Sequence, residues 1–422
     1  MTRTFTDNLF LLAIFLLPWQ TQLIFFRGNI SGEPSAYAVL GVYAVEAMVL
    51  LVFLLRARFA PLVPNRHAKR ALYLFLAAVF FSLSLSAYGS VGWFQVIHVV
   101  AAAMLFSLLC DKRTPLRSVL LAFLLGLTVP IVLAWLQVLT GASPEITLLG
   151  LAAKDAQTLG VSVVETDVGR MLRGYGTFPH PNIFGGYLAA GVLALAWLMR
   201  FVKSRRTLAL ALLCVALLSS TLIVTFSRSA WLSLALSLIL LAALMRKEKK
   251  TLPRQAVPVI GMGLVCLLSI LTIFHTQVFT RFDPTARLEA VSIEERTSQY
   301  QTFGRVFLSS SLLGVGPNAY TFTLSQMDPG QPVWAYQPIH NVFLLILAEL
   351  GIIGFAVFFF WLGRIARLAL LSRRTPNGMF ALALCTTLLV VALLDHYLWT
   401  LWPGLALSAL VLGLVVRFSK AS

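Results

Sequence analysis

The fold is decided by "TLALALLCVALLSSTLIVTFSRSAWLSLALSLILLAALM", residues 207–245, an apolar run in which Arg228 is the only charged residue. As one straight helix this run would be roughly 58 Å long, about twice the thickness of the hydrocarbon core of a membrane. The chain must therefore turn back within the run. We expect two membrane-spanning helices joined by a tight hairpin near Arg228.

The whole chain shares this membrane character. It is 59% hydrophobic and 12% charged, with a mean hydropathy of +0.86, which excludes an ordinary soluble domain. We expect an all-α polytopic membrane protein, with residues 1–422 as a single integral membrane domain whose first span is retained because no small-residue cleavage pattern follows it. About twelve predicted spans follow from the length that crosses a bilayer: 8–26, 35–55, 71–88, 93–110, 118–140, 181–200, 207–226, 229–245, 255–275, 341–363, 378–395 and 397–416.

The net charge of +17 has a topological explanation. With the N-terminus inside and the spans alternating, roughly three quarters of the Lys and Arg residues fall in the inner connections, as the positive-inside rule requires. We therefore expect both termini in the cytoplasm and no nucleic-acid partner. The two longest connections, 141–180 and 276–340, then lie outside, and connections of that length usually fold and carry function.

Several kinds of chemistry lack support in the sequence. The four cysteines all fall within apolar spans and predict neither a disulfide nor a thiol metal site. No phosphate-binding G-x-x-x-x-G-K-[ST] loop and no G-x-S-x-G nucleophile motif occurs. Glu165 and Asp167 have the spacing of a metal-binding pair, but this pattern is short and common, so we expect no metal ion and no cofactor.

Two arginines stand out as candidate anion ligands. Arg228 lies in the predicted hairpin at the outer boundary of the membrane, where it meets either an anion or lipid head groups. Arg296 shares a helical face with Tyr300, Phe303 and Phe307, which predicts an amphipathic helix on the membrane surface. A guanidinium group there can bind two phosphate oxygens, or else pair with an acid on a solvated helix. Weaker candidates of the same kind are Arg281, Arg287 and Arg305.

The end of the first long connection reads "RMLRGYGTFPHPNIFGGYLAAG", residues 170–191. Its glycines and prolines predict an irregular backbone, after which Asn182 is a candidate N-cap for the next helix. Arg173 and His180 are the polar groups that this turn presents to a site. A structural role for His180 at the re-entry into the membrane is an equally good interpretation.

A second irregular entry is "YQPIHNVFLLILAELGIIG", residues 336–354. With Pro338 at the first helical position, His340 lies in the first turn, where the positive end of the helix lowers the pKa of the imidazole. A neutral His340 can accept a proton. Glu349 points to the opposite side of the helix, about 13.5 Å deeper. We interpret Glu349 and Glu46 as polar clamps between helices, although intramembrane acids also occur in transporters.

Four segments together resemble the O-antigen ligase and polymerase superfamily of bacterial envelope enzymes, over residues 173–354: "RGYGTFPHPNIFGGYLA", "FSRSAW", "ERTSQYQTFGRVFLSSSLLGVGPNAY" and "IHNVFLLILAELGIIG". In length and loop plan the chain is most similar to the O-antigen ligases. These enzymes join a glycan carried on undecaprenyl diphosphate to lipid A-core oligosaccharide at the periplasmic face of the inner membrane. The resemblance implies a GT-C-like fold surrounded by membrane lipids.

The resemblance also implies a mechanism, that of a metal-independent, inverting glycosyltransferase. His340 would be the base that deprotonates the acceptor hydroxyl. Arg228 and Arg296, helped by Arg173, would hold the diphosphate of the donor and stabilise its charge as the sugar bond breaks. Arg287 is the alternative to Arg296. The other secondary candidates are Asn182 and Asn341.

Three other functions remain open at this point. The four segments also resemble those of O-antigen polymerases and protein O-oligosaccharyltransferases, so the acceptor is undecided. A lipid or polysaccharide transporter would use intramembrane acids such as Glu46, Glu349 and Asp395 as coupling groups. The chain has no matching halves of the kind that inverted repeats produce, which favours an enzyme.

Overall fold

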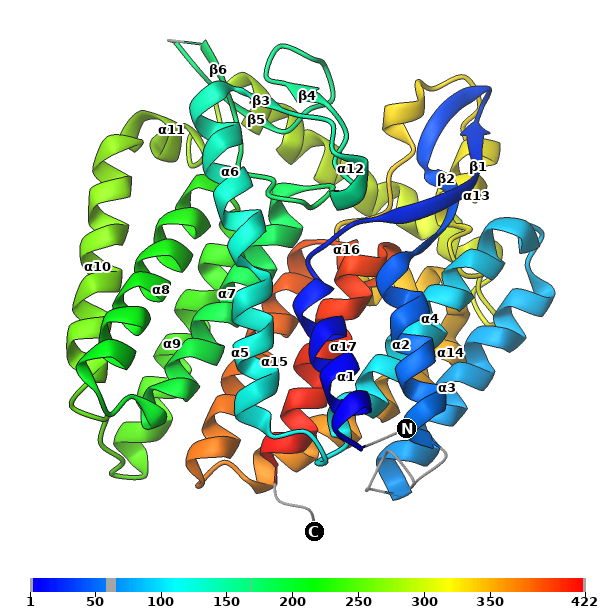
Figure 1. The fold of residues 1–422 in the computed structure, drawn as a ribbon. Coiled ribbons are helices and arrows are strands. Elements are labelled where there is room, and N and C mark those ends of the chain that lie inside the picture. Colours follow the sequence, from blue (N-terminus) through cyan, green and yellow to red (C-terminus); the bar gives the residue numbers. More distant parts are fainter. Residues whose placement is uncertain (1–2, 58–65, 168, 420–422) are drawn as a thin grey trace. The chain divides into compact units, whose positions relative to one another are not determined.

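The computed structural model describes residues 3–57, 66–167 and 169–419, and helices dominate it (Figure 1). The chain forms two compact units, each built from three segments. Unit 1 comprises Met1–Thr21, Lys112–Ile293 and Leu371–Val391, and unit 2 comprises Gln22–Asp111, Glu294–Leu370 and Ala392–Ser422. Every one of these segments contains helix, so the predicted all-α class is confirmed.

Eight helical segments in the described part of the chain are long and apolar enough to span a membrane. They are α4 (Gly89–Cys110), α5 with α6 (Leu116–Thr140), α7 with η2 (Pro181–Phe201), α8 (Arg205–Val224), α9 (Arg228–Lys247), α10 (Ala256–Ile273), α14 (Val342–Leu371) and α15 (Pro376–Leu394). Each of them matches one of the twelve predicted spans. The polytopic architecture is therefore confirmed, while three of the twelve predicted spans differ from the structure.

The N-terminal difference is the largest. The predicted spans 8–26 and 35–55 are wrong in part, because helix α1 (Arg3–Leu16) is followed by an antiparallel hairpin of β1 (Gln22–Ile30) and β2 (Glu33–Tyr43). Both central residues of its two-residue turn, Ser31 and Gly32, have positive φ angles of 53° and 86°. Such a turn matches the twist of paired strands. Helix α2 (Ala44–Ala57) begins only after the hairpin.

The predicted span 71–88 agrees with α3 (Arg66–Leu85). The remaining difference is smaller. The predicted span 397–416 is split into the short α16 (Tyr397–Thr400) and α17 (Trp402–Phe418), because Leu401 between them has an extended backbone. A milder interruption divides α5 (Leu116–Gly126) from α6 (Thr128–Thr140) at Leu127, which keeps helical dihedral angles; the nearby Pro130 has no N–H to donate within the helix.

The opening run folds back as predicted. Helices α8 and α9 are separated only by residues 225–227. Phe226 takes a left-handed conformation, with φ 49°, in this turn, and the Ser227 side chain accepts a hydrogen bond from the backbone N–H of Ala230, capping α9. Arg228 is therefore the first residue of α9.

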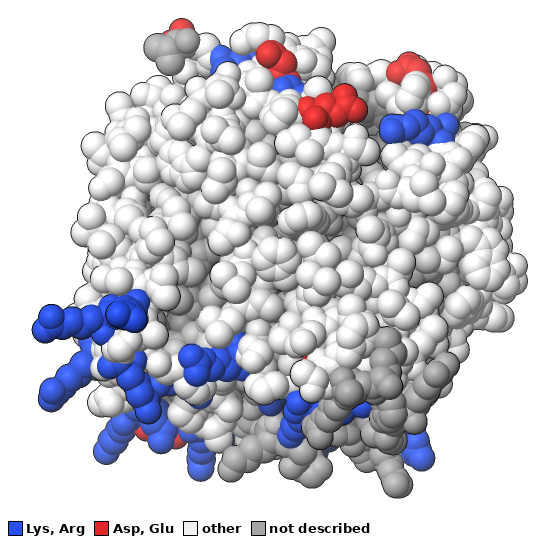
Figure 2. All heavy atoms as spheres, viewed as in Figure 1, with Lys and Arg blue, Asp and Glu red and all other residues white. Residues whose placement is uncertain are grey.

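Within unit 1, α7 packs against α5, α8 and α9, and α10 packs against α8. Exposed cations gather at the end of these helices where α7 leads into α8 and α9 leads into α10 (Figure 2); they are Lys203, Arg205, Arg206, Arg246, Lys247, Lys249, Lys250 and Arg254. The α8–α9 turn lies at the opposite end of the same helices. This separation agrees with the positive-inside rule, and the assignment of the basic end to the cytoplasm stays a prediction.

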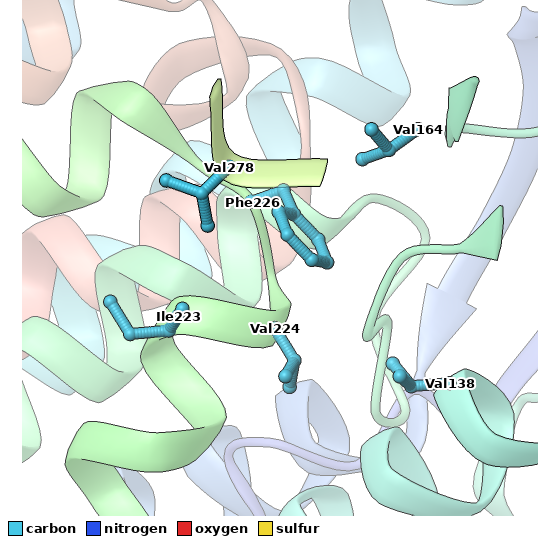
Figure 3. Packing of buried hydrophobic residues seen from close by; sticks show 6 residues of the cluster. All are labelled: Val138, Val164, Ile223, Val224, Phe226 and Val278. Atoms are coloured by element: carbon cyan, nitrogen blue, oxygen red, sulfur yellow. The ribbon is translucent and has the colours of Figure 1, made fainter. Parts of the chain in front are cut away.

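The first long connection folds into short strands above the α8–α9 turn. It contains β3 (Ala142–Ser143), η1 (Thr147–Leu149), β4 (Lys154–Asp155), β5 (Val163–Thr166) and β6 (Gly169–Leu172). A hydrophobic cluster joins this connection to the turn and to α11 (His275–Thr280) (Figure 3). Its buried members are Val138, Val164, Ile223, Val224, Phe226 and Val278. The cluster fixes the backbone from which the polar groups of unit 1 extend.

The second long connection is largely helical, and it includes the helix predicted around Arg296. Its helices are α11, α12 (Arg287–Ser309), α13 (Tyr320–Met327) and η3 (Val333–Ala335). Helix α12 begins in unit 1 and ends in unit 2. It carries Glu289 in unit 1 and Gln299, whose side chain contacts His340, in unit 2.

In unit 2, α4 packs against α2, α3 and α17, and α14 is kinked at Gly351, which has φ 67°. The kink frees backbone groups that pair with the loop before α13. Thus Gly316 N–H donates to Glu349 O at 2.9 Å, and Ile352 N–H donates to Ser311 O at 2.9 Å. These bonds satisfy buried backbone groups that a regular helix would have paired internally.

The two intramembrane acids act as clamps, as predicted. The Glu349 carboxylate accepts hydrogen bonds from the Trp399 indole at 2.7 Å and from Asn318 N–H at 3.0 Å. The Glu46 carboxylate lies 2.6 Å from His98 Nδ1 on α4. Each acid joins two separate elements of unit 2, which is the compensation that a buried polar group needs.

The kink generates a stability prediction. A Cβ atom at Gly351 would lie 2.3 Å from Leu312 O, and the positive φ angle adds strain, so Gly351→Ala should lower the free energy of unfolding by about 1–3 kcal/mol. Gly363→Ala in the same helix is the control, because a Cβ atom there meets nothing within 4 Å. The thermal midpoint of the purified protein in detergent measures both. Equal midpoints for the two variants would contradict the kink as described.

Candidate functional site

The predicted site residues fall into two clusters of polar side chains. The arginine cluster, in unit 1, consists of Arg173, Arg228 and Arg281 with Glu289. The histidine cluster, in unit 2, consists of His340, His396 and Asp395. The structure thus brings Arg173 and Arg228 together in unit 1, and it places His340 and Arg296 in unit 2.

The α8–α9 turn positions the arginine cluster. Two of its backbone carbonyls accept hydrogen bonds from guanidinium groups: Arg173 Nε donates to Thr225 O at 2.8 Å, and Arg281 Nε donates to Phe226 O at 3.2 Å. These carbonyls follow the C-terminus of α8, where unpaired acceptors favour cations. The turn therefore needs arginines to satisfy its own backbone.

Arg173 is the most buried arginine of the cluster, at 5% exposure. Its Nη2 donates to the Asn182 side-chain oxygen at 2.7 Å, in addition to the bond to the turn. Burial lowers the pKa of Arg173 well below its ordinary value, and the neighbouring Arg281 lowers it further. A negatively charged ligand near Arg173 would oppose both effects.

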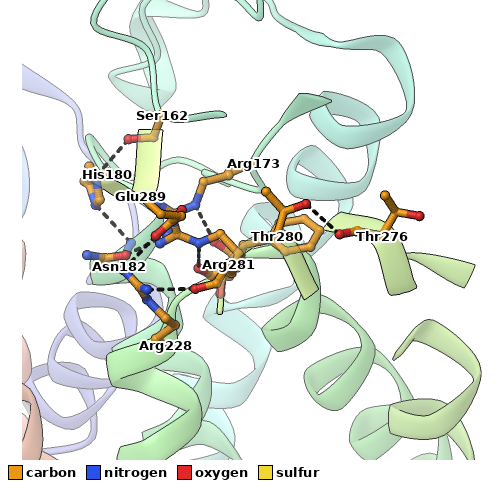
Figure 4. A network of polar contacts seen from close by, with 11 residues as sticks. Ser162, Arg173, His180, Asn182, Arg228, Thr276, Thr280, Arg281 and Glu289 are labelled. Carbon is orange, nitrogen blue, oxygen red and sulfur yellow. Dashed lines mark hydrogen bonds and ion pairs between the residues drawn. The ribbon is translucent and has the colours of Figure 1, made fainter. Parts of the chain in front are cut away.

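Glu289 is the counterion of this cluster (Figure 4). Arg228 Nη2 lies 2.9 Å from one carboxylate oxygen of Glu289, and Arg281 forms an ion pair with the other oxygen. Arg228 Nη1 also donates to the backbone oxygen of Arg281 at 2.7 Å. The side chain of Glu289 is 4% exposed and that of Arg228 is 29% exposed. Two guanidinium groups thus pair with one carboxylate, and Arg228 is the more exposed of the two.

The loop residues around the cluster have structural partners. His180 caps α7, because its Nδ1 accepts a hydrogen bond from Asn182 N–H at 3.1 Å, while its Nε2 lies 2.9 Å from the Ser162 hydroxyl. The prediction that Asn182 caps this helix is therefore wrong. Asn182 instead bonds to Arg173, since its position inside the first turn directs its side chain away from the helix end.

Arg287, the alternative to Arg296, forms a bidentate pair with Glu165 at 2.9 and 2.7 Å. This pair joins the two long connections within unit 1. It lowers the pKa of the Glu165 carboxyl, first through the hydrogen bond from Arg287. The Arg287 side chain is 66% exposed, so the pair contributes little to stability.

His340 precedes α14 and does not lie in its first turn. The predicted helix start at Pro338 is wrong because the helix begins at Val342, and Asn341 is its cap: the Asn341 side-chain oxygen accepts hydrogen bonds from Phe343 N–H and Leu344 N–H. His340 Nδ1 lies 2.8 Å from the Gln299 side-chain oxygen, which fixes the orientation of the ring.

The low pKa expected for His340 has a different cause from the predicted one. Burial, and to a smaller extent the nearby His396, lower the pKa of His340 to about 3, although Asp395 acts in the opposite direction. The two rings meet edge to face with centroids 5.0 Å apart. His340 is therefore a neutral imidazole at physiological pH, as a proton acceptor must be.

Arg296 lies on α12, one turn before Gln299, and is half-buried. Its charge lowers the pKa of both His340 and His396, which places it in their neighbourhood. Among the described residues we find no hydrogen bond or ion pair made by the Arg296 side chain. It is thus a cation available to a ligand beside His340. On the predicted apolar face, Phe303 and Phe307 stack on each other, and the contact of this face with the membrane surface stays a prediction.

Sequence reasoning undervalued several of these residues. From the sequence, Arg281 is a weaker candidate than Arg296, and no local pattern marks Glu289 or Gln299. The importance of these residues comes from contacts between segments that are distant in sequence. Asp395 and His396 carried a local signal, an adjacent acid and imidazole between two apolar spans.

Part of the chain matches a known protein family. Residues 213–359 match the family model described as O-antigen ligase, about a third of the sequence. The matched segment contains Arg228, Arg281, Glu289, Arg296 and His340, whereas Arg173 and the pair Asp395–His396 lie outside it. No curated protein matches the chain. The protein is thus a multi-pass membrane protein in which residues 213–359 match the O-antigen ligase family, a group of glycosyltransferase-like enzymes.

Proposed function

We propose that this protein is an O-antigen ligase that transfers a glycan from undecaprenyl diphosphate to a sugar hydroxyl of lipid A-core oligosaccharide. The reaction takes place at the periplasmic side of the bacterial inner membrane, where the connections 141–180 and 276–340 lie in this proposal. The family match supports the proposal because its segment contains Arg228, Arg296 and His340. O-antigen ligases act on lipid-linked glycan and lipid A-core, which supports the choice of donor and acceptor.

The arginine cluster is the observation that carries the proposal. Three guanidinium groups and one carboxylate leave two positive charges in excess, at the end of unit 1 opposite its basic loops. Planar guanidinium groups bind phosphate oxygens in pairs. A diphosphate carries enough negative charge to compensate this excess. A neutral substrate or an isolated carboxylate would not.

The histidine cluster supplies the complementary group. In the proposed reaction His340 accepts the proton of the acceptor hydroxyl, and the freed oxygen attacks the anomeric carbon on the face opposite the diphosphate. The bond between the anomeric carbon and the diphosphate oxygen breaks, and its electron pair stays with the diphosphate. Guanidinium groups stabilise that developing charge. The configuration at the anomeric carbon is inverted, and no metal ion takes part.

The low pKa of His340 suits the resting enzyme and must rise for catalysis. A bound diphosphate adds negative charge, which favours the imidazolium form and makes His340 a stronger base. Arg296 lies near the imidazole and has no described partner, so we assign it to the donor as well. Binding of the donor thereby makes His340 a stronger base for the transfer reaction.

Glu289 occupies the position of an anion between Arg228 and Arg281. We infer that the donor diphosphate competes with this carboxylate for the two guanidinium groups. In this proposal Arg173 keeps its bonds to the turn and to Asn182, and so holds the cluster together when the diphosphate displaces the Glu289 carboxylate.

Reconstitution tests the proposed reaction. Purified protein, given undecaprenyl-diphosphate-linked glycan and lipid A-core, should form ligated product in the presence of a chelator. His340→Ala should reduce turnover by about 10²–10⁴-fold, the usual contribution of a general base. It should still bind the donor. Gel mobility of the lipid product measures turnover, and equilibrium binding of the labelled donor measures retention.

The control is Arg305→Ala, since Arg305 pairs with Asp328 at 2.7 Å on the surface, with its side chain 51% exposed. It should keep nearly full turnover. Full activity of His340→Ala would show that His340 is not the base. A glycan lengthened on undecaprenyl diphosphate, with the core lipid unmodified, would show a polymerase and overturn the acceptor assignment.

Two substitutions in the arginine cluster should change the affinity for the donor in opposite directions. Arg228→Ala should weaken binding of undecaprenyl diphosphate, because it removes the most exposed guanidinium group of the cluster. Glu289→Gln should tighten binding by about tenfold, equivalent to roughly 1.4 kcal/mol, because it removes the competing anion. Calorimetric titration of both variants with undecaprenyl diphosphate in detergent provides the dissociation constants.

Glu165→Gln is the matched control for this pair, since Glu165 also binds an arginine in unit 1 but at the surface. Its dissociation constant should equal that of the unmodified protein. If Glu289→Gln bound the donor more weakly, the carboxylate would be orienting the arginines and the competition model would be wrong.

A further inference from the structure

We propose that His340, His396 and Asp395 form a binding site for a late transition-metal ion such as Zn²⁺. One ligand atom of each side chain lies within 4.8 Å of the other two. In the part of the chain that the structure describes, no other set of three His, Cys, Asp or Glu side chains meets this condition. Imidazole nitrogens with a carboxylate oxygen are a ligand set that Zn²⁺ and its neighbours in the series prefer.

The surroundings of the two imidazoles support this assignment independently. The Nδ1 atom of His340 lies 2.8 Å from the Gln299 oxygen, and the Nδ1 atom of His396 lies 2.8 Å from the Thr400 hydroxyl. Metal-binding histidines characteristically use one ring nitrogen for such an outer partner, which fixes the ring and its tautomer. The Nε2 atoms of both rings are then the ones available to a metal ion.

The carboxylate is held in place as well. Asp395 Oδ1 accepts a hydrogen bond from His396 N–H at 2.8 Å, and both residues are buried, at 4% and 8% exposure. Tetrahedral ligands at 2.0–2.1 Å from Zn²⁺ lie about 3.3 Å apart, so small side-chain rotations would close the cluster around an ion. Three protein ligands leave one coordination position open, as in zinc sites that exchange ligands.

Charge nearby sets the character of the site. Arg296 acts electrostatically on both imidazoles, and Asp395 is the single carboxylate of the cluster. A cation is therefore attracted by one negative charge and repelled by one positive charge. This balance favours reversible binding over a permanently held structural ion.

The consequence for activity rests on the proposed function. If His340 is the base, a metal ion on its Nε2 occupies the lone pair that must accept the proton. Zn²⁺ should then inhibit glycan transfer in competition with the acceptor, and a chelator should restore it. The site is thus an inhibitory one, and it is compatible with a reaction that uses no metal.

Cobalt spectroscopy tests the site without any assay of activity. Metal-free protein in detergent is titrated with Co²⁺, and the visible d–d absorption of the bound ion is followed. We expect saturation at one ion per chain and loss of the signal when Zn²⁺ displaces Co²⁺. His396→Gln and Asp395→Asn should each weaken Co²⁺ binding by at least about tenfold.

Two further variants make the test specific. Thr400→Val leaves all three ligands in place but removes the outer partner of His396, and should weaken binding by about 10–100-fold. His275→Gln alters an exposed histidine in unit 1 and should leave the titration unchanged. Absence of the signal from the unmodified protein, or equal signals from all variants, would overturn the site.

An inhibition assay separates this proposal from the proposed function. A cobalt signal that depends on His396 and Asp395, together with transfer activity insensitive to Zn²⁺, would keep the site and refute its inhibitory role. The same cobalt signal in a protein that shows no transfer activity would refute the proposed function alone.

Discussion

Two backbone carbonyls in a three-residue turn hold the proposed donor site together. The turn between α8 and α9 ends one helix and begins another so abruptly that Thr225 O and Phe226 O find no partner within the helices, and guanidinium groups satisfy them. Arg173 comes to this turn from the first long connection and Arg281 from the second. The apolar cluster around Phe226 fixes the backbone on which both depend. The proposed anion site therefore depends on this turn, which binds an arginine from each long connection.

In the proposed reaction, the arginine cluster binds the diphosphate and the histidine cluster accepts the proton of the hydroxyl, and each role suits the charge of its cluster. The arginine cluster retains excess positive charge and keeps a buried carboxylate, Glu289, as its counterion. The histidine cluster keeps its imidazoles neutral through burial, with Gln299 fixing the orientation of His340. Helix α12 contributes to both, since Glu289 and Gln299 lie on it. A neutral imidazole with a fixed orientation suits proton transfer, and it also suits metal coordination, which is why the same cluster carries both proposals.

Sequence reasoning succeeded where one dominant constraint applies. The run around Arg228 is too long to cross a membrane once, so the hairpin and its charged turn were predictable, as were the clamps formed by Glu46 and Glu349. It failed where tertiary contacts decide. Hydropathy does not distinguish the β1–β2 hairpin from a helix, and Ser31–Gly32 was its only local signal. The low pKa of His340 was anticipated from a helix end, yet it arises from burial and from His396, a residue distant in sequence. Arg281 and Glu289 likewise gain importance only through the folded turn.

The central claim is that both clusters serve one bond between a sugar and a diphosphate. An electron cryomicroscopy structure of the protein with bound undecaprenyl-diphosphate-linked glycan tests it most directly. We predict that Arg228 and Arg281 contact the diphosphate oxygens in place of Glu289, and that His340 faces the acceptor side of the anomeric carbon, with room for a hydroxyl oxygen about 3–3.5 Å from that carbon. A diphosphate held away from the arginine cluster, or an anomeric carbon beyond the reach of a hydroxyl bound to His340, would contradict the account.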